Sequence, residues 1–176
     1  MDKIVDRLWL GNHADVRWIE EGEEDRVTAV LNVAYDLRLT IPPTIRYVQT
    51  GLVNRPNHPA FYASAILQLH GLLEEGHSVL CLCCSGKHRS PAVVAGYLVY
   101  KGIVESMDDA LNLIDSRRTI TGRDKLCRHH AAVAVLAHRL RQSNDLLTLP
   151  GEPYEPEADD GSEVDSRVAG NDLDSA

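Results

Sequence analysis

The chain has 176 residues, 44% of them hydrophobic, and a formal net charge of −8 at pH 7. This length suffices for one domain with a substantial core, and the composition is that of an ordinary soluble globular protein. No apolar stretch is long enough to cross a membrane, and the first residues lack a secretory signal. We therefore expect a cytoplasmic protein with no membrane partner.

The negative charge is concentrated at the end of the chain. Residues 150–176 carry nine acidic residues and one arginine, whereas residues 1–149 carry 17 of each sign. The terminal segment is rich in Pro, Gly and Ser and lacks the apolar residues that offset the entropy of ordering, so we expect a disordered tail. A neutral body with an acidic tail gives no support for nucleic-acid binding. We divide the chain into one domain at 1–149 and a tail at 150–176.

Strand and helix patterns alternate along the body of the chain. Short apolar or alternating runs rich in β-branched residues predict strands, and apolar residues at helical spacing, with Pro near the start or Gly near the end, predict helices. The predicted strands are residues 7–12, 27–34, 45–53 and 78–82. The predicted helices are residues 58–76, 90–101, 106–118 and 123–142. This alternation predicts an α/β domain with a central mixed sheet of about four to five strands flanked by helices.

The segment "LCLCCSGKHRSPAVVAGYLV" at 80–99 carries the chemistry. A buried strand ends in cysteines, a glycine-containing turn with two cations follows, and a helix begins. Backbone N–H groups and the positive end of the helix then converge on one point, which is the geometry of an anion site. A cysteine in that positive field has a lowered pKa and is a nucleophile facing a bound phosphate. Arg89 is suited to bind such a phosphate with two parallel hydrogen bonds.

Spacing selects one of the cysteines. Cys83 stands six residues before Arg89, with Gly86 midway and Ser90 directly after the arginine. This C-x5-R pattern resembles the cysteine-dependent protein phosphatases, and specifically the compact dual-specificity and tyrosine phosphatase group. The segment "KIVDRLWLGN" resembles that group's opening strand. The resemblance runs from about Lys3 to Leu140, and the strand–loop–helix context makes the motif fairly specific.

The resemblance implies a role for each residue of the loop. Cys83 is the expected nucleophile, which forms a phosphocysteine intermediate. Arg89 is expected to clamp two phosphate oxygens, and Ser90 to hydrogen-bond the Cys83 sulfur as it leaves. The mechanism uses no cofactor and no metal. The backbone amides of the loop are expected to bind the phosphate; they belong to Cys84, Ser85, Gly86, Lys87, His88 and Arg89.

Three positions depart from the family's pattern. Leu82 stands where the family has a histidine that helps orient the loop, and His88 stands where a small residue is common. The third departure concerns the aspartate that protonates the leaving oxygen. Asn54 takes its place, and residues 37–73 contain no Asp or Glu. We therefore expect weak or atypical acid catalysis, because general acid help is worth roughly 10²–10⁴ in rate.

Two histidines are alternative proton donors. His58 is close to Asn54 in sequence, but Pro59 places it at a helix N-terminus, which disfavours a protonated imidazole. His88 lies between Lys87 and Arg89, whose charges disfavour it as well. The simpler interpretation makes His58 a helix-start residue and His88 a part of the loop scaffold.

The remaining thiols and cations near the loop have simpler interpretations too. Cys81 is expected to be a small core residue, and a disulfide between Cys83 and Cys84 would be strained. A zinc site from Cys81, Cys83, Cys84 and His88 is disfavoured, because these residues are spaced too tightly for a tetrahedral set. The fourth cysteine, Cys127, lies apart from the others. Lys87 either adds charge for a highly anionic substrate or is a solvated loop residue. Three arginines either border the pocket or lie on helix ends, namely Arg117, Arg118 and Arg123.

We expect a phosphate monoester hydrolase that acts on a phosphorylated protein or peptide, with phosphotyrosine favoured. Two alternatives remain open at this stage. One is a phosphate-binding pseudophosphatase with little turnover. The other is an enzyme acting on RNA 5′-phosphates or phosphoinositides. The neutral body argues weakly against the RNA substrate. The sequence does not specify an oligomeric state.

Overall fold

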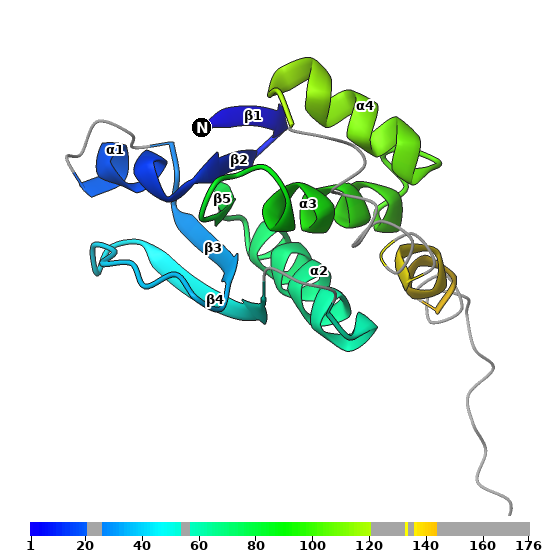
Figure 1. The fold of residues 1–176 in the computed structure, drawn as a ribbon, viewed down its shortest axis with the longest axis horizontal. Helices are drawn as coiled ribbons and strands as arrows, with labels where there is room; N and C mark the ends of the chain where they lie inside the picture. The colour runs from blue at the N-terminus through cyan, green and yellow to red at the C-terminus, as the bar shows by residue number, and fades with distance from the viewer. Residues whose placement is uncertain (21–25, 54–56, 121–132, 134–135, 144–176) are drawn as a thin grey trace, which may run out of the picture.

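The computed structural model describes residues 1–20, 26–53, 57–120, 133 and 136–143. Five strands form one sheet in the order β1-β2-β5-β3-β4, and helices lie on both of its sides (Figure 1). The strands are β1 (Asp2–Val5), β2 (Leu8–Asn12), β3 (Ala29–Ala34), β4 (Arg46–Leu52) and β5 (Val79–Cys83). The helices are η1 (His13–Asp15), α1 (Val16–Glu20), α2 (Pro59–Glu74), α3 (Arg89–Tyr100) and α4 (Met107–Arg117).

The predicted α/β architecture with a mixed sheet is confirmed. β2, β5, β3 and β4 run parallel, and only β1 pairs antiparallel, with β2. Parallel strands place their carboxyl ends at one edge of the sheet, where α/β proteins bind their ligands. In this chain the segments that leave this edge follow Asn12, Ala34, Leu52 and Cys83.

Side-chain alternation along the strands divides the core between the two faces of the sheet. On β5, Cys81 and Cys83 point to the large core beneath α2, α3 and α4, whereas Leu80 and Leu82 point to a smaller core. The smaller core contains Val16 and Ile19 and lies on the side of α1. Leu82 is thus a fully buried core residue on the face opposite the Cys83 thiol.

The helix boundaries follow from capping. α2 begins at Pro59, whose fixed φ suits the first helical position, and His58 caps it by accepting a hydrogen bond from the backbone of Ala60. Ser106 caps α4, because its hydroxyl accepts from the Asp109 N–H at 3.1 Å. α3 is buried over its whole length, so it is the central helix of the large core.

The sequence patterns missed three elements near the N-terminus. β1, η1 and α1 are four, three and five residues long, too short to show a clear periodicity. Part of the predicted last helix at 123–142 is confirmed, because residues 136–143 are helical. The rest of that helix, apart from residue 133, and the predicted tail at 150–176 lie outside the described residues.

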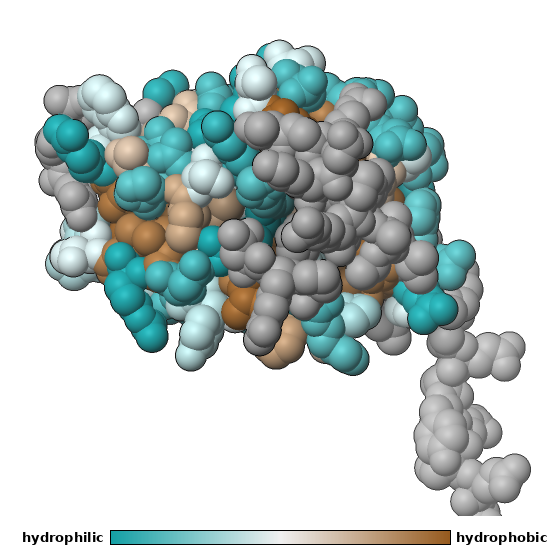
Figure 2. Space-filling view, viewed as in Figure 1, coloured by the Kyte–Doolittle hydropathy of each residue, from teal (hydrophilic) through white to brown (hydrophobic). Residues whose placement is uncertain are grey.

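The surface of the side seen in Figure 1 is mostly hydrophilic, and hydrophobic residues are visible on its left part, between α1 and β4 (Figure 2). In the part of the chain that the structure describes, no helix is long and apolar enough to span a membrane.

Candidate active site

The phosphate-loop candidate connects β5 to α3 at the carboxyl edge of the sheet. It consists of residues 84–88, and Arg89 is the first residue of α3. Gly86 has φ +65°, a conformation that L side chains rarely adopt. A Cβ atom at Gly86 would also lie 2.6 Å from the carbonyl oxygen of Gly11 in β2. A side chain at this position would therefore push the loop away from the sheet.

The Cys83 thiol lies where β5 meets this loop and is 1% exposed. Burial raises the pKa of Cys83, but hydrogen bonds from the Ser90 side chain and from the backbone of Ser90 and Gly86, together with the Arg89 charge, outweigh it. The pKa of Cys83 is therefore lowered. The Ser90 hydroxyl donates to Cys83 Sγ at 3.2 Å. This arrangement favours the thiolate, the nucleophilic form of cysteine.

The neighbouring cysteines have different environments. Cys81 is fully buried in the strand, and burial raises its pKa well above the usual value. Cys84 is half-buried, and its Sγ accepts a hydrogen bond from Arg89 Nη2 at 3.1 Å. The anionic form is therefore disfavoured at Cys81 and favoured at Cys83, two residues further along the same face of the same strand.

The Arg89 side chain is almost buried, and its contacts come from the ends of two other strands. Nη1 donates to the Asp36 carboxylate, which follows β3, and to the carbonyl oxygen of Leu52, which ends β4, at 3.0 Å. The hydrogen bond from Arg89 lowers the pKa of Asp36 despite some desolvation, so this carboxyl is ionised at neutral pH. The Asp36 side chain is nevertheless 55% exposed.

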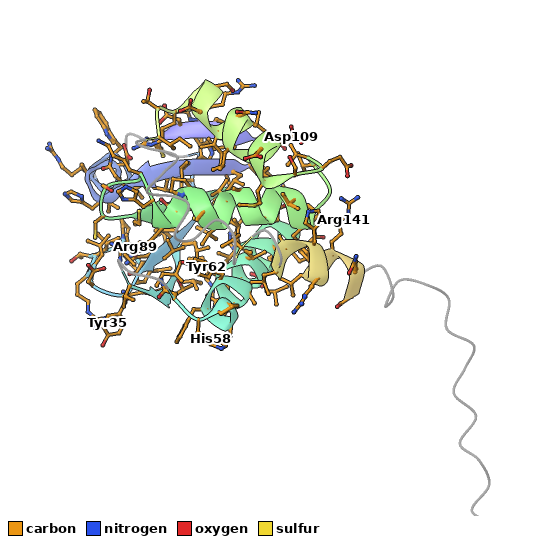
Figure 3. The ribbon with its side chains drawn as sticks, turned by 45° about the vertical axis from the view of Figure 1, so that its right-hand side comes forward. Tyr35, His58, Tyr62, Arg89, Asp109 and Arg141 are labelled. Carbon is orange, nitrogen blue, oxygen red and sulfur yellow. The ribbon has the colours of Figure 1, made fainter. Side chains whose placement is uncertain are left out.

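Asp36 is the residue that the sequence interpretation missed. It lies 53 positions before Arg89, and no motif joins the two. The available signal was topological: Asp36 follows the carboxyl end of β3, which pairs with β5 in parallel. Figure 3 shows Arg89 at the same end of the molecule as Tyr35, the neighbour of Asp36, and far from Asp109 and Arg141.

The segment expected to supply the acid is described only at its two ends, because Asn54 lies outside the described residues. The Asn57 side chain bridges back to Val53, accepting from its N–H and donating to its carbonyl oxygen, each at 3.0 Å. At the start of α2, His58 Nδ1 accepts from the Ala60 N–H at 3.2 Å, and a nitrogen that accepts carries no proton. This bond caps the first turn of α2, in agreement with a helix-start role for His58.

The other cations near the loop differ in position. Lys87 is exposed and His88 precedes α3 as its N-cap residue. Arg118 follows α4 and reaches β1 and the loop: its Nη1 is 2.5 Å from the Asp2 carboxylate, and its Nη2 lies 2.9 Å from the Cβ position at Gly86. Arg118 therefore borders the back of the loop. Arg123 lies outside the described residues. Among the described residues, no group of three His, Cys, Asp or Glu side chains is placed to hold a metal ion.

No family model matches the chain. It is 28% identical over 101 residues to the human dual specificity protein phosphatase 22, a match that covers 56% of this chain and 54% of that protein. The chain thus spans about half the length of the curated relative that it matches.

Solved structures share the fold. Human DUSP28 superposes with a TM-score of 0.65 at 16% identity, covering 84% of this chain and 100% of that chain. DUSP15 superposes with a TM-score of 0.67 at 18% identity, covering 82% of this chain and 94% of that chain. The human tyrosine phosphatase-like serine/threonine/tyrosine-interacting protein superposes with a TM-score of 0.60 at 19% identity. This match covers 85% of this chain and 98% of that chain.

In fold, these comparisons confirm the resemblance: the chain has the fold of the solved dual-specificity phosphatase structures DUSP28 and DUSP15. The sequence similarity to dual specificity protein phosphatase 22 agrees with the resemblance to the compact dual-specificity and tyrosine phosphatase group.

Proposed function

We propose that this chain hydrolyses phosphate monoesters as a protein-tyrosine phosphatase of the dual-specificity type, through a phosphocysteine intermediate on Cys83. The observation that carries the proposal is the Cys83 thiol with its lowered pKa, hydrogen-bonded to Ser90 at the N-terminus of α3 and six residues before Arg89. The similarity to dual specificity protein phosphatase 22 supports the same class of substrate, a phosphorylated protein or peptide.

In the first step, the Cys83 thiolate attacks phosphorus, so the S–P bond forms while the P–O bond to the leaving group breaks. The loop amides from Cys84 to Arg89 bind the phosphate oxygens. Nη1 of Arg89 is occupied by Asp36 and Leu52, and Nη2 gives one hydrogen to Cys84. The Nε–H and the second Nη2–H have no partner among the described residues, so two donors remain for the phosphate.

In the second step, water attacks phosphorus, the S–P bond breaks, and inorganic phosphate and the thiolate are released. The Ser90 hydroxyl, 3.2 Å from Cys83 Sγ, donates to the sulfur as it regains negative charge. The same contacts that lower the pKa of Cys83 make it a good leaving group, since both depend on stabilising the thiolate.

The proton for the leaving oxygen is the weak point of the site. Asn54 cannot donate as an acid, and the Asp36 carboxyl is held ionised by Arg89. The leaving group must then depart largely as an anion. A phenolate has a conjugate acid with a pKa of about 10 and leaves far more readily than an alkoxide. This supports phosphotyrosine and other aryl phosphates as substrates over phosphoserine.

The proposed catalytic domain comprises residues 1–149, with residues 150–176 dispensable as an acidic tail. The free thiols clustered at Cys81, Cys83 and Cys84 support a reducing, cytoplasmic location.

The test compares turnover of an aryl phosphate by the wild type, Cys83→Ser and the control Cys127→Ser, whose thiol lies outside the loop motif. We expect activity in the wild type and in the control and none in Cys83→Ser. Rapid acid quenching with a ³²P-labelled aryl phosphate should trap label on Cys83. A wild type that binds vanadate but shows neither turnover nor label would contradict the proposed function and favour a phosphate-binding pseudophosphatase.

A further inference from the structure

The outer side of the phosphate loop, away from the proposed phosphate position, rests on the end of β2. The parallel pairing of β2 with β5 sets Asn12 opposite Cys83. The residues that directly follow the two strands, His13 after β2 and Cys84 after β5, therefore lie side by side where the chain leaves the sheet. The carbonyl oxygen of Cys84 accepts from His13 Nδ1 at 2.7 Å and from the His13 backbone N–H at 3.4 Å.

The first of these contacts assigns a proton to the imidazole. A backbone carbonyl oxygen only accepts hydrogen bonds, so Nδ1 of His13 must be the donor. His13 is otherwise an exposed residue. The distance of 2.7 Å lies at the short end of the range for N–H···O hydrogen bonds.

The backbone that carries His13 is itself held in place. Asn12 Oδ1 accepts from the Ala14 N–H at 2.8 Å, and the Asn12 N–H donates to the Asp15 carboxylate at 2.7 Å, which together form a capping box. The N-terminal amine of Met1 pairs with the other Asp15 oxygen at 2.5 Å. The imidazole is thus presented from a fixed turn rather than from a loose loop.

We propose that His13 is a positioning residue for the phosphate loop. A trans peptide points its C=O and the following N–H in opposite directions. With the Cys84 carbonyl fixed toward His13, the Ser85 N–H points away from His13, to the inner side of the loop. His13 therefore opposes rotation of this peptide, which would replace an inward N–H with an electronegative carbonyl oxygen. The proposal rests on the proposed function of the loop.

The residue directly before the nucleophile does not perform this task. Leu82 lies in the small core on the opposite face of the sheet, whereas His13 reaches the loop from the neighbouring strand. The contact joins two residues that are 71 positions apart in the sequence, and no spacing motif indicates it.

The test uses His13→Ala, His13→Asn and the control His77→Ala. Asn carries an N–H donor close to the position of Nδ1, so His13→Asn keeps the bond. His77 also makes a surface contact through Nδ1, with Thr28 at 3.1 Å, but it precedes the other end of β5. The readouts are the Kd of vanadate and the pH dependence of Cys83 alkylation by iodoacetamide.

We expect His13→Ala to weaken vanadate binding by about 3- to 10-fold, the usual net value of one hydrogen bond, and to shift Cys83 alkylation to higher pH. His13→Asn should restore both, and His77→Ala should match the wild type. Unchanged values in His13→Ala would overturn the proposal, as would a loss that His13→Asn does not restore.

The experiment still decides if His13→Ala does not fold or if the wild type shows no turnover. If His13→Ala fails to fold by thermal melting, the affinity of His13→Asn alone decides: wild-type affinity supports the proposal, and a 3- to 10-fold loss overturns it. If the wild type binds vanadate without turnover, the proposed function fails, but the vanadate and alkylation comparison still tests His13.

Discussion

The nucleophile side and the leaving-group side of the site differ in the groups that they present to a phosphate ester. On the nucleophile side, residues 83–90 combine a thiol of lowered pKa, a hydroxyl donor and a buried guanidinium. On the leaving-group side, residues 37–73 contain no carboxylate at all. The carboxylate that does reach the site, Asp36, is bound to Arg89 and held ionised. Phosphate binding and thiolate attack are therefore separable from proton donation in this chain.

The largest effect is expected from Arg89→Lys. Lysine keeps the charge but lacks the planar set of donors, so it cannot hold Asp36, Leu52 and a phosphate at once. Vanadate affinity, measured by calorimetry, should fall by roughly 10²-fold, the value of one or two charge-assisted hydrogen bonds. Arg141→Lys, at the opposite end of the molecule (Figure 3), is the matched control. Equal affinity in Arg89→Lys and the wild type would remove Arg89 from the phosphate site.

A comparable gain is expected from adding the missing acid. Asn54→Asp introduces a proton donor of nearly equal size. If the segment closes over the substrate, turnover of esters with poor leaving groups should rise by up to roughly 10²-fold, the lower end of general acid catalysis. Activated aryl esters need no proton and should gain little. The measurement is a leaving-group series for both proteins. A flat series in the wild type would mean that another group already supplies the proton, and His58 and His88 would be mutated next.

A smaller effect is expected from Ser90→Ala. Removing the hydroxyl deletes the largest of the contacts that lower the pKa of Cys83, while burial, which raises it, stays. The pKa of Cys83 should therefore move up, and alkylation should reach its half-maximal rate at a higher pH. Turnover below neutral pH should fall by about 3- to 10-fold, the usual net value of one hydrogen bond, because a smaller fraction of Cys83 is then thiolate. Ser116→Ala, in α4, removes a similar hydroxyl bond at the surface and should change neither.

The sequence predicted the nucleophile side far better than its supports. Cys83, Gly86, Arg89 and Ser90 lie within eight residues, so spacing alone relates them to one strand, turn and helix. The supports of that loop are long-range. Asp36 accepts a hydrogen bond from Arg89, which is 53 positions away in the sequence, and His13 donates one to Cys84, which is 71 positions away. Such contacts depend on strand order and register, which a single sequence does not encode in any local pattern.

The register itself explains why these partners are the ones present. β2 and β3 are the two neighbours of β5 in the sheet. The residues just beyond their carboxyl ends, His13 and Asp36, therefore flank the loop that leaves β5. One supports its outer backbone and the other holds its arginine. A topology in which β5 had other neighbours would need other supports at the same two places.

The smallest effect is expected at Asp36, where two contributions oppose each other. The carboxylate orients Arg89 through Nη1, which helps phosphate binding, but its negative charge repels a phosphate dianion. Asp36→Asn keeps an oxygen that accepts from Nη1 and removes the charge. Because the Asp36 side chain is 55% exposed, solvent screens that charge and its removal should matter little. Vanadate affinity should rise by about 2- to 5-fold, the range for exposed charge pairs.

Asp36→Ala separates the two contributions, because it removes the accepting oxygen together with the charge. Arg89 is 4% exposed, so losing this partner leaves a buried guanidinium with one donor unsatisfied, oriented only by Leu52 and Cys84. We expect vanadate affinity in Asp36→Ala to fall below that of the wild type, while Asp36→Asn rises above it. If orientation and charge act as described, the two variants change the vanadate affinity in opposite directions when both are measured at the same ionic strength. Equal gains in the two variants would mean that Asp36 acts on the phosphate site through its charge alone.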